Sequence, residues 1–270
     1  MKVVLFCGGQ GMRLRETSQA VPKPMVAIGD RPLLWHLMKY YSFYGHKDFL
    51  LCLGHGGDVI RQAFPEYKNE GVPNQLKSAR ADNKFGWLQS DSGDWRVSLV
   101  DTGRDSNVGQ RLLRIRKFVD EEELFLANYA DGLSDLVLPK LIDFFLRSGK
   151  IACFIGVRPT ATFHQVILGK DGVVEEIAHI ARSGSIINGG YFVFRREIFN
   201  YIEEGEDLVD EPFHRLIKER QLIAYLHDGF WACMDTFKDK QHLEDLHARG
   251  RPPWQVWMNG HAPGEGGNLC

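Results

Sequence analysis

Short apolar runs alternate with amphipathic segments through the first 157 residues, and no other feature of the chain constrains its fold as strongly. The runs are rich in β-branched and aromatic residues, as strands are, and lie at 2–7, 48–53, 95–101, 124–129 and 151–157. Helical patterns fall between most of them, at 32–44, 57–64, 108–119 and 138–146. Strands connected by helices form parallel sheets that are covered on both faces. We therefore predict an α/β fold with a mostly parallel sheet flanked by helices.

The pattern changes after Pro159. Two strand-like runs, 166–168 and 173–177, flank the turn Gly169-Lys170-Asp171-Gly172, and Asp-Gly is typical of a hairpin turn. We expect an antiparallel hairpin insertion at about 159–190 within a single domain that spans 1–257. The remaining expected elements are strands at 186–194 and 222–226, helices at 210–220 and 237–248, and a polar, flexible tail at 258–270.

The charges of the chain nearly cancel, since 33 basic and 35 acidic residues give a formal net charge of -2. Binding to a phosphate backbone requires a basic surface, so we expect no nucleic-acid partner. No apolar run reaches the roughly 18 to 20 residues of a membrane span, so we expect no membrane partner either. The five cysteines are scattered without a C-x-x-C pair, which indicates a reduced, cytoplasmic protein without structural zinc.

The most informative motif follows the first predicted strand directly. It reads Gly8-Gly9-Gln10-Gly11-Met12-Arg13-Leu14 and is followed by Pro22-Lys23-Pro24-Met25. Glycines after a strand allow backbone N–H groups to approach phosphate oxygens, and Arg13 and Lys23 can neutralise a triphosphate. The spacing excludes a Walker-type loop and a dinucleotide loop, because no G-x-x-x-x-G-K-[ST] is present and a leucine stands at position 14. The alternative is a glycine turn that only joins strand to helix. Lys23 disfavours it, because the two flanking prolines fix its backbone, as a lysine that binds a phosphate at one place requires.

Two carboxylates are candidate metal ligands. Asp131 lies in Asn128-Tyr129-Ala130-Asp131-Gly132 at the carboxyl end of the fourth predicted strand, and Asp235 lies just before the last predicted helix. Magnesium usually takes one or two protein carboxylates and completes its shell with water and phosphate oxygens. For Asp235 the alternative is a helix N-cap, a position that aspartate strongly prefers.

These motifs, in this order, resemble the sugar-1-phosphate nucleotidyltransferase family over roughly residues 1–257, and most closely its glucose-1-phosphate cytidylyltransferase branch. The segments 187–193 and 234–236 also carry the resemblance to the family, and the segments 32–39, 99–103, 229–231 and 253–254 carry the resemblance to this branch. The resemblance implies a Rossmann-like sheet and an enzyme that needs Mg²⁺. In its reaction, an oxygen of the sugar 1-phosphate attacks the α-phosphorus of a nucleoside triphosphate, here CTP, and pyrophosphate leaves. Family members are commonly oligomers, so we expect a homo-oligomer.

The resemblance also assigns roles to individual residues. Arg13, Lys23, Asp131 and Asp235 would be catalytic, and the two aspartates would bind the Mg²⁺. The nucleotide would be bound by Gly8, Gly9, Gln10, Gly11, Met12, Thr102, Gly103 and Arg111. Arg111 lies on a predicted helix that also carries Arg114, Arg116 and Lys117, so a solvated basic face is the alternative for it.

The acceptor side departs from the family pattern. His164 follows Phe163 where the family has a Phe-Gly loop, and His179 stands where the lysine of a Glu-Lys-Pro is expected. A histidine, with an ordinary pKa of about 6.5, is a poorer phosphate clamp at neutral pH than a lysine. The expected acceptor-binding residues are Tyr129, Gly132, His164, His179, Asn188 and Glu211. For Tyr129 the alternative is core packing, and for Glu211 it is an acidic first turn of a helix.

Two other functions stay open at this stage. The same chemistry could use a non-glucose acceptor or another triphosphate, since the changes concentrate on the acceptor side. Alternatively, the chain could be a nucleotide-binding regulatory protein without turnover. The presence of Arg13 and Lys23 together with both aspartates argues against this alternative, because a site without turnover has no physical need for two metal carboxylates.

Overall fold

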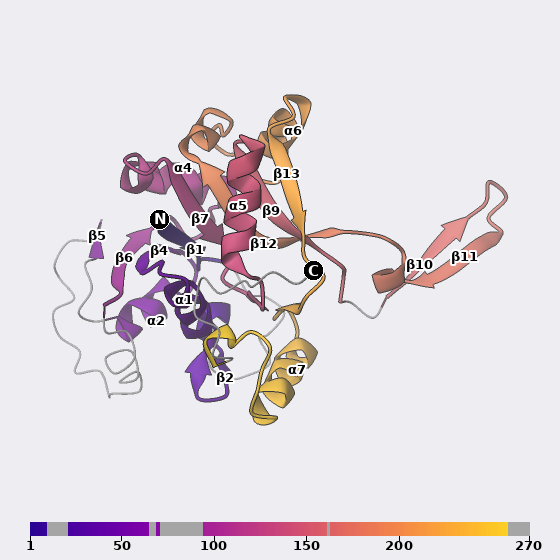
Figure 1. The fold of residues 1–270 in the computed structure, drawn as a ribbon, viewed down its shortest axis with the longest axis horizontal. Coiled ribbons are helices and arrows are strands. Elements are labelled where there is room, and N and C mark those ends of the chain that lie inside the picture. Colours follow the sequence, from indigo (N-terminus) through magenta and orange to yellow (C-terminus); the bar gives the residue numbers. More distant parts are fainter. Residues whose placement is uncertain (10–20, 65–68, 71–93, 161–162, 259–270) are drawn as a thin grey trace, which may run out of the picture.

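The computed structural model describes residues 1–9, 21–64, 69–70, 94–160 and 163–258 (Figure 1). Its centre is an eight-stranded sheet with the order β13-β9-β12-β7-β1-β4-β6-β5. These strands are β1 (Lys2–Phe6), β4 (Asp48–Leu53), β5 (Asn69–Glu70), β6 (Arg96–Asp101), β7 (Leu124–Asn128), β9 (Ala152–Val157), β12 (Ile187–Arg195) and β13 (Leu222–Leu226). Only β12 runs antiparallel to its neighbours, so the predicted mostly parallel sheet is confirmed.

Helices cover both faces of this sheet. They are α1 (Leu33–Phe43), α2 (Gly57–Ala63), α4 (Val108–Val119), α5 (Leu138–Ser148), α6 (Glu211–Lys218) and α7 (Phe237–Ala248). Successive residues of β1 point to opposite sides: Val3 and Leu5 join a buried cluster with α1, α2 and α5, whereas Val4 and Phe6 join one with α4 and α6. Strands buried on both faces read as continuous apolar runs, which explains the pattern of the sequence. In the described ranges, no helix combines the length and apolar character that crossing a membrane requires.

Two short antiparallel ladders were not predicted. One pairs β2 (Ala27–Ile28) with β3 (Arg31–Pro32), and the other pairs β8 (Gly132–Ser134) with β14 (Trp231–Cys233). Strands of two or three residues are too short to show a period of two in the sequence. The β8–β14 ladder nevertheless determines the geometry of the site.

The predicted hairpin insertion is present. It consists of β10 (His164–Leu168) and β11 (Val174–His179), and Gly172 in its turn has a φ of 81°. Figure 1 shows this hairpin, called the arm below, projecting to one side, away from the sheet and its helices. All five residues of β10 and the first four of β11 are exposed.

The other predicted elements are confirmed with small shifts at their ends. The predicted helix 210–220 is α6 (Glu211–Lys218), and the predicted helix 237–248 is α7. Most of the long connection from 65 to 94 and nearly all of the tail at 258–270 lie outside the described residues. The predicted single domain over 1–257 stays a prediction.

Candidate functional site

The site lies at the carboxyl ends of β1, β4, β6 and β7. Gly8 and Gly9 follow β1 and border a cavity of about 300 Å³, whereas Gln10, Gly11, Met12 and Arg13 lie outside the described residues. The cavity is lined by Phe6, Gly8, Gly9, Arg104, Asp105, Ser106, Asn107, Val108, Arg111, Tyr129, Asp131 and Asp207. This is the edge at which ligands bind in open α/β sheets.

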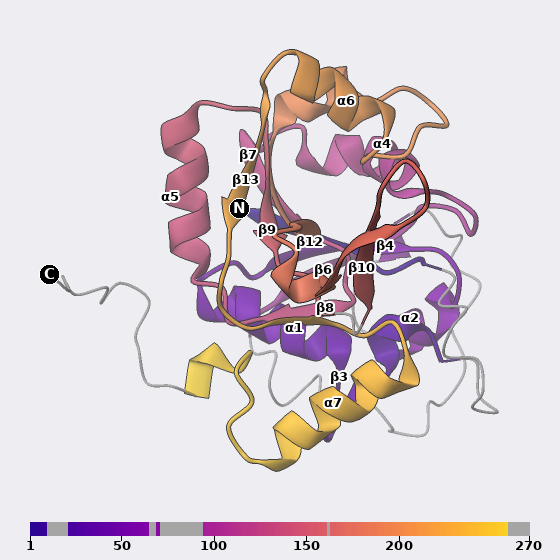
Figure 2. The same cartoon turned by 90° about the vertical axis from the view of Figure 1, so that its right-hand side faces the viewer.

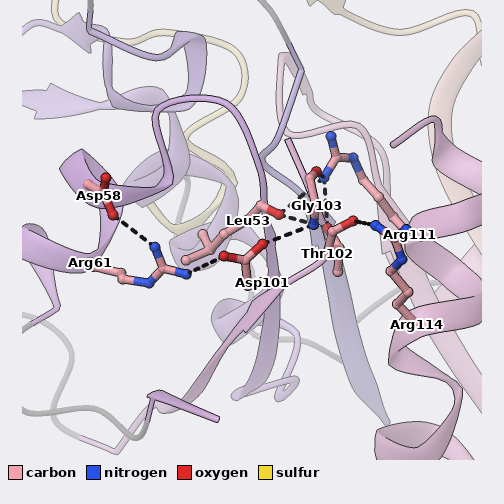
Figure 3. Close-up of polar contacts among 8 residues, drawn as sticks. All are labelled: Leu53, Asp58, Arg61, Asp101, Thr102, Gly103, Arg111 and Arg114. Carbon is pink, nitrogen blue, oxygen red and sulfur yellow. Dashed lines mark hydrogen bonds and ion pairs between the residues drawn. The ribbon is translucent and has the colours of Figure 1, made fainter. Parts of the chain in front are cut away.

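Arg111 is buried beside Leu53, Thr102 and Gly103 and does not lie on a solvated face (Figure 3). Only 3% of its surface is exposed, and its guanidinium donates to Gly8 O at 2.9 Å, Leu53 O at 3.1 Å, Thr102 Oγ1 at 2.7 Å and Gly103 O at 3.0 Å. One side chain thus connects the ends of three neighbouring strands. A Cβ at Gly8 would fall 2.3 Å from this guanidinium, so any other residue there would have to displace Arg111. The alternative of a solvated basic face is wrong for Arg111.

The charge of Arg111 is held mainly by neutral oxygens. Burial lowers its pKa, because the charged form loses hydration, but an arginine stays protonated at neutral pH. All four of the acceptors named above are carbonyl or hydroxyl oxygens. Its positive charge, beside the cavity, therefore favours an anionic ligand.

Thr102 and Gly103 are fixed by hydrogen bonds of their own. The buried hydroxyl of Thr102 donates to Leu53 O at 2.7 Å, and Gly103, with a φ of 85°, donates its N–H to Asp101 Oδ1 at 2.9 Å. Asp101 also accepts from Arg61 on α2, as Figure 3 shows. Burial acts to raise the pKa of Asp101, but the Gly103 N–H and Arg61 outweigh burial and lower it. These bonds fix the segment that leads into Arg104, which lines the cavity, whereas Thr102 and Gly103 do not line it themselves.

Lys23, Asp131 and Asp235 meet in one cluster, as the sequence predicts for a phosphate and metal site. Lys23 Nζ lies 2.5 Å from Asp235 Oδ1 and 3.2 Å from Asp131 Oδ2. The Pro-Lys-Pro segment forms a 3₁₀ turn, in which the Met25 N–H donates to Pro22 O at 2.8 Å. The two prolines therefore hold the backbone of Lys23 in a defined turn, as expected, and the lysine side chain extends from this turn to both carboxylates.

The β8–β14 ladder brings the two aspartates together. Asp131 precedes β8 and Asp235 follows β14, and because these strands are antiparallel both residues lie at the same end of the ladder. The Met234 N–H donates to Asp131 O at 2.8 Å and closes that end. Ala130, with a φ of 61°, is a non-glycine residue in the left-handed region, held there by its N–H bond to Asn128 Oδ1. This strained turn orients Asp131.

The three charges of this cluster depend on one another. Burial acts to lower the pKa of Lys23, but Asp131 and Asp235 outweigh burial and raise it, so the ammonium is protonated. Burial raises the pKa of Asp131, and Lys23 opposes that effect by stabilising the carboxylate. The protonated ammonium forms ion pairs with both aspartates.

The donor set fits magnesium. Thr236 caps α7 in a reciprocal capping box with Asp239, so Asp235 lies next to the cap and is not the cap itself. The carboxylate of Asp235 points to Lys23 Nζ, as that of Asp131 does. No group of three or more His, Cys, Asp or Glu side chains suited to a metal occurs in the ranges that the structure describes. Two carboxylates alone suit a cation that completes its shell with water and phosphate oxygens.

Three of the expected acceptor residues gather near this cluster. The Asn188 side-chain amide donates to the Tyr129 hydroxyl at 3.1 Å, and Gly132 O accepts from the Tyr191 hydroxyl at 3.2 Å. Tyr129 lines the cavity next to Asp131, and burial raises its pKa. The structure thus places Tyr129, Gly132 and Asn188 beside the carboxylates.

The other three expected acceptor residues lie elsewhere. His164 and His179 face each other across the base of the arm, with ring centroids 5.4 Å apart. Glu211 is exposed at the start of α6, and Figures 1 and 2 place α6 and α7 at opposite ends of the molecule. Since Asp235 lies two residues before α7, Glu211 is not brought to the carboxylate cluster.

Several residues of the site were missed by sequence reasoning. Arg104, Ser106 and Asn107 line the cavity from the segment that leads into α4, and Asp207 lines it from the loop before α6. The position of Asn107 could have been predicted from the sequence, because Asn107 and Gln110 have the spacing of a capping box at the start of α4. Asp207 has no such signal, since its position depends on the packing of α6.

The chain is similar to known proteins over most of its length. The nucleotidyl transferase family matches residues 2–241. The chain is 38% identical over 259 residues to the glucose-1-phosphate cytidylyltransferase of Salmonella typhimurium, covering 95% of this chain and all of that protein. It is 34% identical over 261 residues to the probable glucose-1-phosphate cytidylyltransferase of Bacillus subtilis, with the same coverage.

Solved structures share the fold. A putative glucose-1-phosphate thymidylyltransferase from Bacillus anthracis has a TM-score of 0.64 at 17% identity and covers 91% of this chain and 94% of its own. A UDP-glucose pyrophosphorylase from Acinetobacter baumanii has a TM-score of 0.65 at 18% identity and covers 96% of each chain. Together with the 34–38% identical relatives, these findings confirm the predicted resemblance, and the chain belongs to the nucleotidyl transferase family.

Proposed function

We propose that this protein transfers the cytidylyl group of CTP to a sugar 1-phosphate, with glucose 1-phosphate as the first candidate, and releases pyrophosphate. The observation that carries the proposal is the cluster of Lys23, Asp131 and Asp235 beside the glycine loop and the cavity. The relatives that share 34–38% of its residues are glucose-1-phosphate cytidylyltransferases, which supports both substrates.

On this proposal the chain acts by placing and neutralising charge. Lys23 holds the reacting phosphates, Gly8 and Gly9 present backbone N–H groups to them, and Asp131 and Asp235 hold Mg²⁺. When bound, Mg²⁺ neutralises the charge that develops on the phosphate oxygens. Gln10, Gly11, Met12 and Arg13 would complete the loop, with Arg13 on the leaving pyrophosphate. Thr102 and Gly103 would border the base, and the charge of Arg111 would support the loop from below.

The acceptor would be oriented by Tyr129, Gly132 and Asn188, which lie next to the carboxylates. His164, His179 and Glu211 stay predictions for acceptor binding, because they lie apart from that group. A non-glucose acceptor or another triphosphate is the alternative within the same chemistry. Nucleotide binding without turnover is the alternative outside it.

The protein would work as a homo-oligomer in the reduced cytoplasm. The arm carries exposed apolar side chains, including Phe163, Leu168 and Ile177, and an isolated two-stranded hairpin is only marginally stable in water. Coverage by another copy would stabilise it. Cys7, Cys52, Cys153 and Cys233 are free thiols, as a reducing compartment would keep them.

The test is pyrophosphate release in the presence of Mg²⁺, with CTP, UTP, dTTP, GTP and ATP each paired with a panel of sugar 1-phosphates. We expect CTP to be the best donor and glucose 1-phosphate to be accepted. Release only with another sugar would replace the acceptor but keep the chemistry. Nucleotide binding without release under any pairing would support the regulatory alternative and overturn the proposal.

A further inference from the structure

The ammonium of Lys23 lies where a cation bound by both metal-site aspartates would lie. Its Nζ is 2.5 Å from one oxygen of Asp235 and 3.2 Å from one oxygen of Asp131. The side chain of Lys23 is only 16% exposed, whereas those of Asp131 and Asp235 are 30% and 46% exposed. The lysine is therefore the most buried member of the cluster, and both aspartates are more exposed to solvent than it is.

A divalent cation and this ammonium compete for the same two carboxylates. Mg²⁺ binds carboxylate oxygens at about 2.0 to 2.1 Å, so a cation on Asp131 and Asp235 would lie within a few ångströms of Nζ. Like charges repel strongly at such a separation in a partly buried site. The two aspartates also balance only two positive charges, one of which Lys23 already supplies. Both cations therefore cannot bind these oxygens fully without further negative charge.

The backbone of Lys23 is fixed, but its side chain can turn. Pro22 and Pro24 flank it, and the turn bonds of Met25 and Val26 hold the main chain. Four rotatable bonds separate this main chain from the ammonium, so Nζ can exchange carboxylate partners for phosphate partners without a backbone change. A triphosphate at the glycine loop would supply the negative charge that draws Nζ away.

We propose that Lys23 excludes divalent metal from Asp131 and Asp235 in the nucleotide-free protein, so that metal and triphosphate bind together. The inference rests on the proposed function of the two aspartates as metal ligands. Its consequence is a binding order: free metal binds the protein weakly, and metal binds tightly only once triphosphate oxygens have taken over the ammonium.

The test is Mn²⁺ binding to the nucleotide-free protein, with bound and free Mn²⁺ distinguished by electron paramagnetic resonance. We expect Lys23→Met and Lys23→Gln to bind Mn²⁺ at least tenfold more tightly than the unmodified protein, although both lose turnover. Lys23→Arg, which keeps the charge, should bind it as weakly as the unmodified protein does. Thermal unfolding of each variant checks that the fold is retained.

Two matched variants separate this effect from a general loss of positive charge. Lys240→Met removes a lysine that pairs with Glu244 along α7, and it should leave Mn²⁺ binding unchanged. Adding Asp131→Asn to Lys23→Met should abolish the gain. Mn²⁺ affinities within twofold of each other in the unmodified protein, Lys23→Met and Lys23→Gln would overturn the inference. So would a gain that survives Asp131→Asn.

The proposed function is tested separately, because formation of CDP-sugar by the unmodified protein does not depend on how the nucleotide-free variants bind Mn²⁺. Product formation together with unchanged Mn²⁺ affinity in Lys23→Met would overturn the inference alone. Absence of product together with a gain in Mn²⁺ affinity would overturn the proposed function, while the competition between Lys23 and the metal would stand.

Discussion

The strand ends around Arg111 and the arm differ in how much the rest of the molecule packs against them. At the strand ends, Arg111 is 3% exposed and donates four hydrogen bonds that connect three strands. On the arm, Phe163 is 71% exposed and Ile177 is 61% exposed. The comparison teaches that the core of the fold fixes the residues around Arg111. The arm, in contrast, receives few contacts from that core.

Departures from the family motifs are found on the arm and not at the carboxylate cluster. Lys23 and the two aspartates match the family motifs and form one cluster, whereas His164 and His179 depart from those motifs and lie on the arm. A residue fixed by many partners tolerates few substitutions, because each change leaves buried polar groups unpaired. Residues of an exposed hairpin can change without that cost. We therefore expect substitutions to reduce activity most at the carboxylates and to change it least on the arm.

The largest expected effect is at the carboxylate cluster. Asp131→Asn should reduce turnover by about a thousandfold or more, because the amide carries no charge for the metal or for Lys23. The thermal unfolding temperature should change little. Steady-state pyrophosphate release measures this, with Asp143→Asn on the exposed side of α5 as the matched control. Near-normal turnover in Asp131→Asn would remove Asp131 from the metal site.

A smaller effect is expected beneath the glycine loop. Arg111→Met should lower the free energy of unfolding by about 2 to 3 kcal/mol, because it removes four hydrogen bonds that connect the ends of three strands. It should also raise the KM for CTP, since Gly8 loses its support.

Denaturant unfolding of Arg111→Met against Arg116→Met measures the first part of that prediction. Arg116 lies on the same helix but is exposed, so its replacement should cost less than about 0.5 kcal/mol. Equal stability losses in the two variants would show that the buried network of Arg111 is not what holds the strand ends.

The smallest effect is expected on the arm. His179→Lys should raise the kcat/KM for glucose 1-phosphate by about threefold, because a lysine is fully charged at neutral pH and a histidine is not. The control is Gln165→Lys. Gln165 follows His164, the cross-strand partner of His179, and therefore points to the opposite face of the arm, so its replacement adds a lysine at a different place and should have no such effect. An unchanged kcat/KM in His179→Lys would show that His179 does not occupy the position of the family's phosphate-binding lysine.

The sequence predicts most of the sheet and its helices, because strands such as Val3 to Phe6 are buried on both faces and read as apolar runs. It also predicts Lys23, Asp131 and Asp235, because their motifs are local. It does not predict how they meet, since the three-residue strands β8 and β14 have no readable period. Nor does it show that Arg111 is buried, because its partners Gly8 and Leu53 are distant in sequence. The left-handed conformation of Ala130 could not be predicted from the sequence either, because it depends on the hydrogen bond from its N–H to the Asn128 side chain.

The most direct test of the central claim is to incubate the protein with CTP, glucose 1-phosphate and Mg²⁺ and to identify the products by chromatography and mass spectrometry. The account predicts CDP-glucose and pyrophosphate in equal amounts, with loss of both in Asp131→Asn. Release of CMP without a nucleotide sugar, or recovery of unchanged CTP with every sugar 1-phosphate offered, would contradict it.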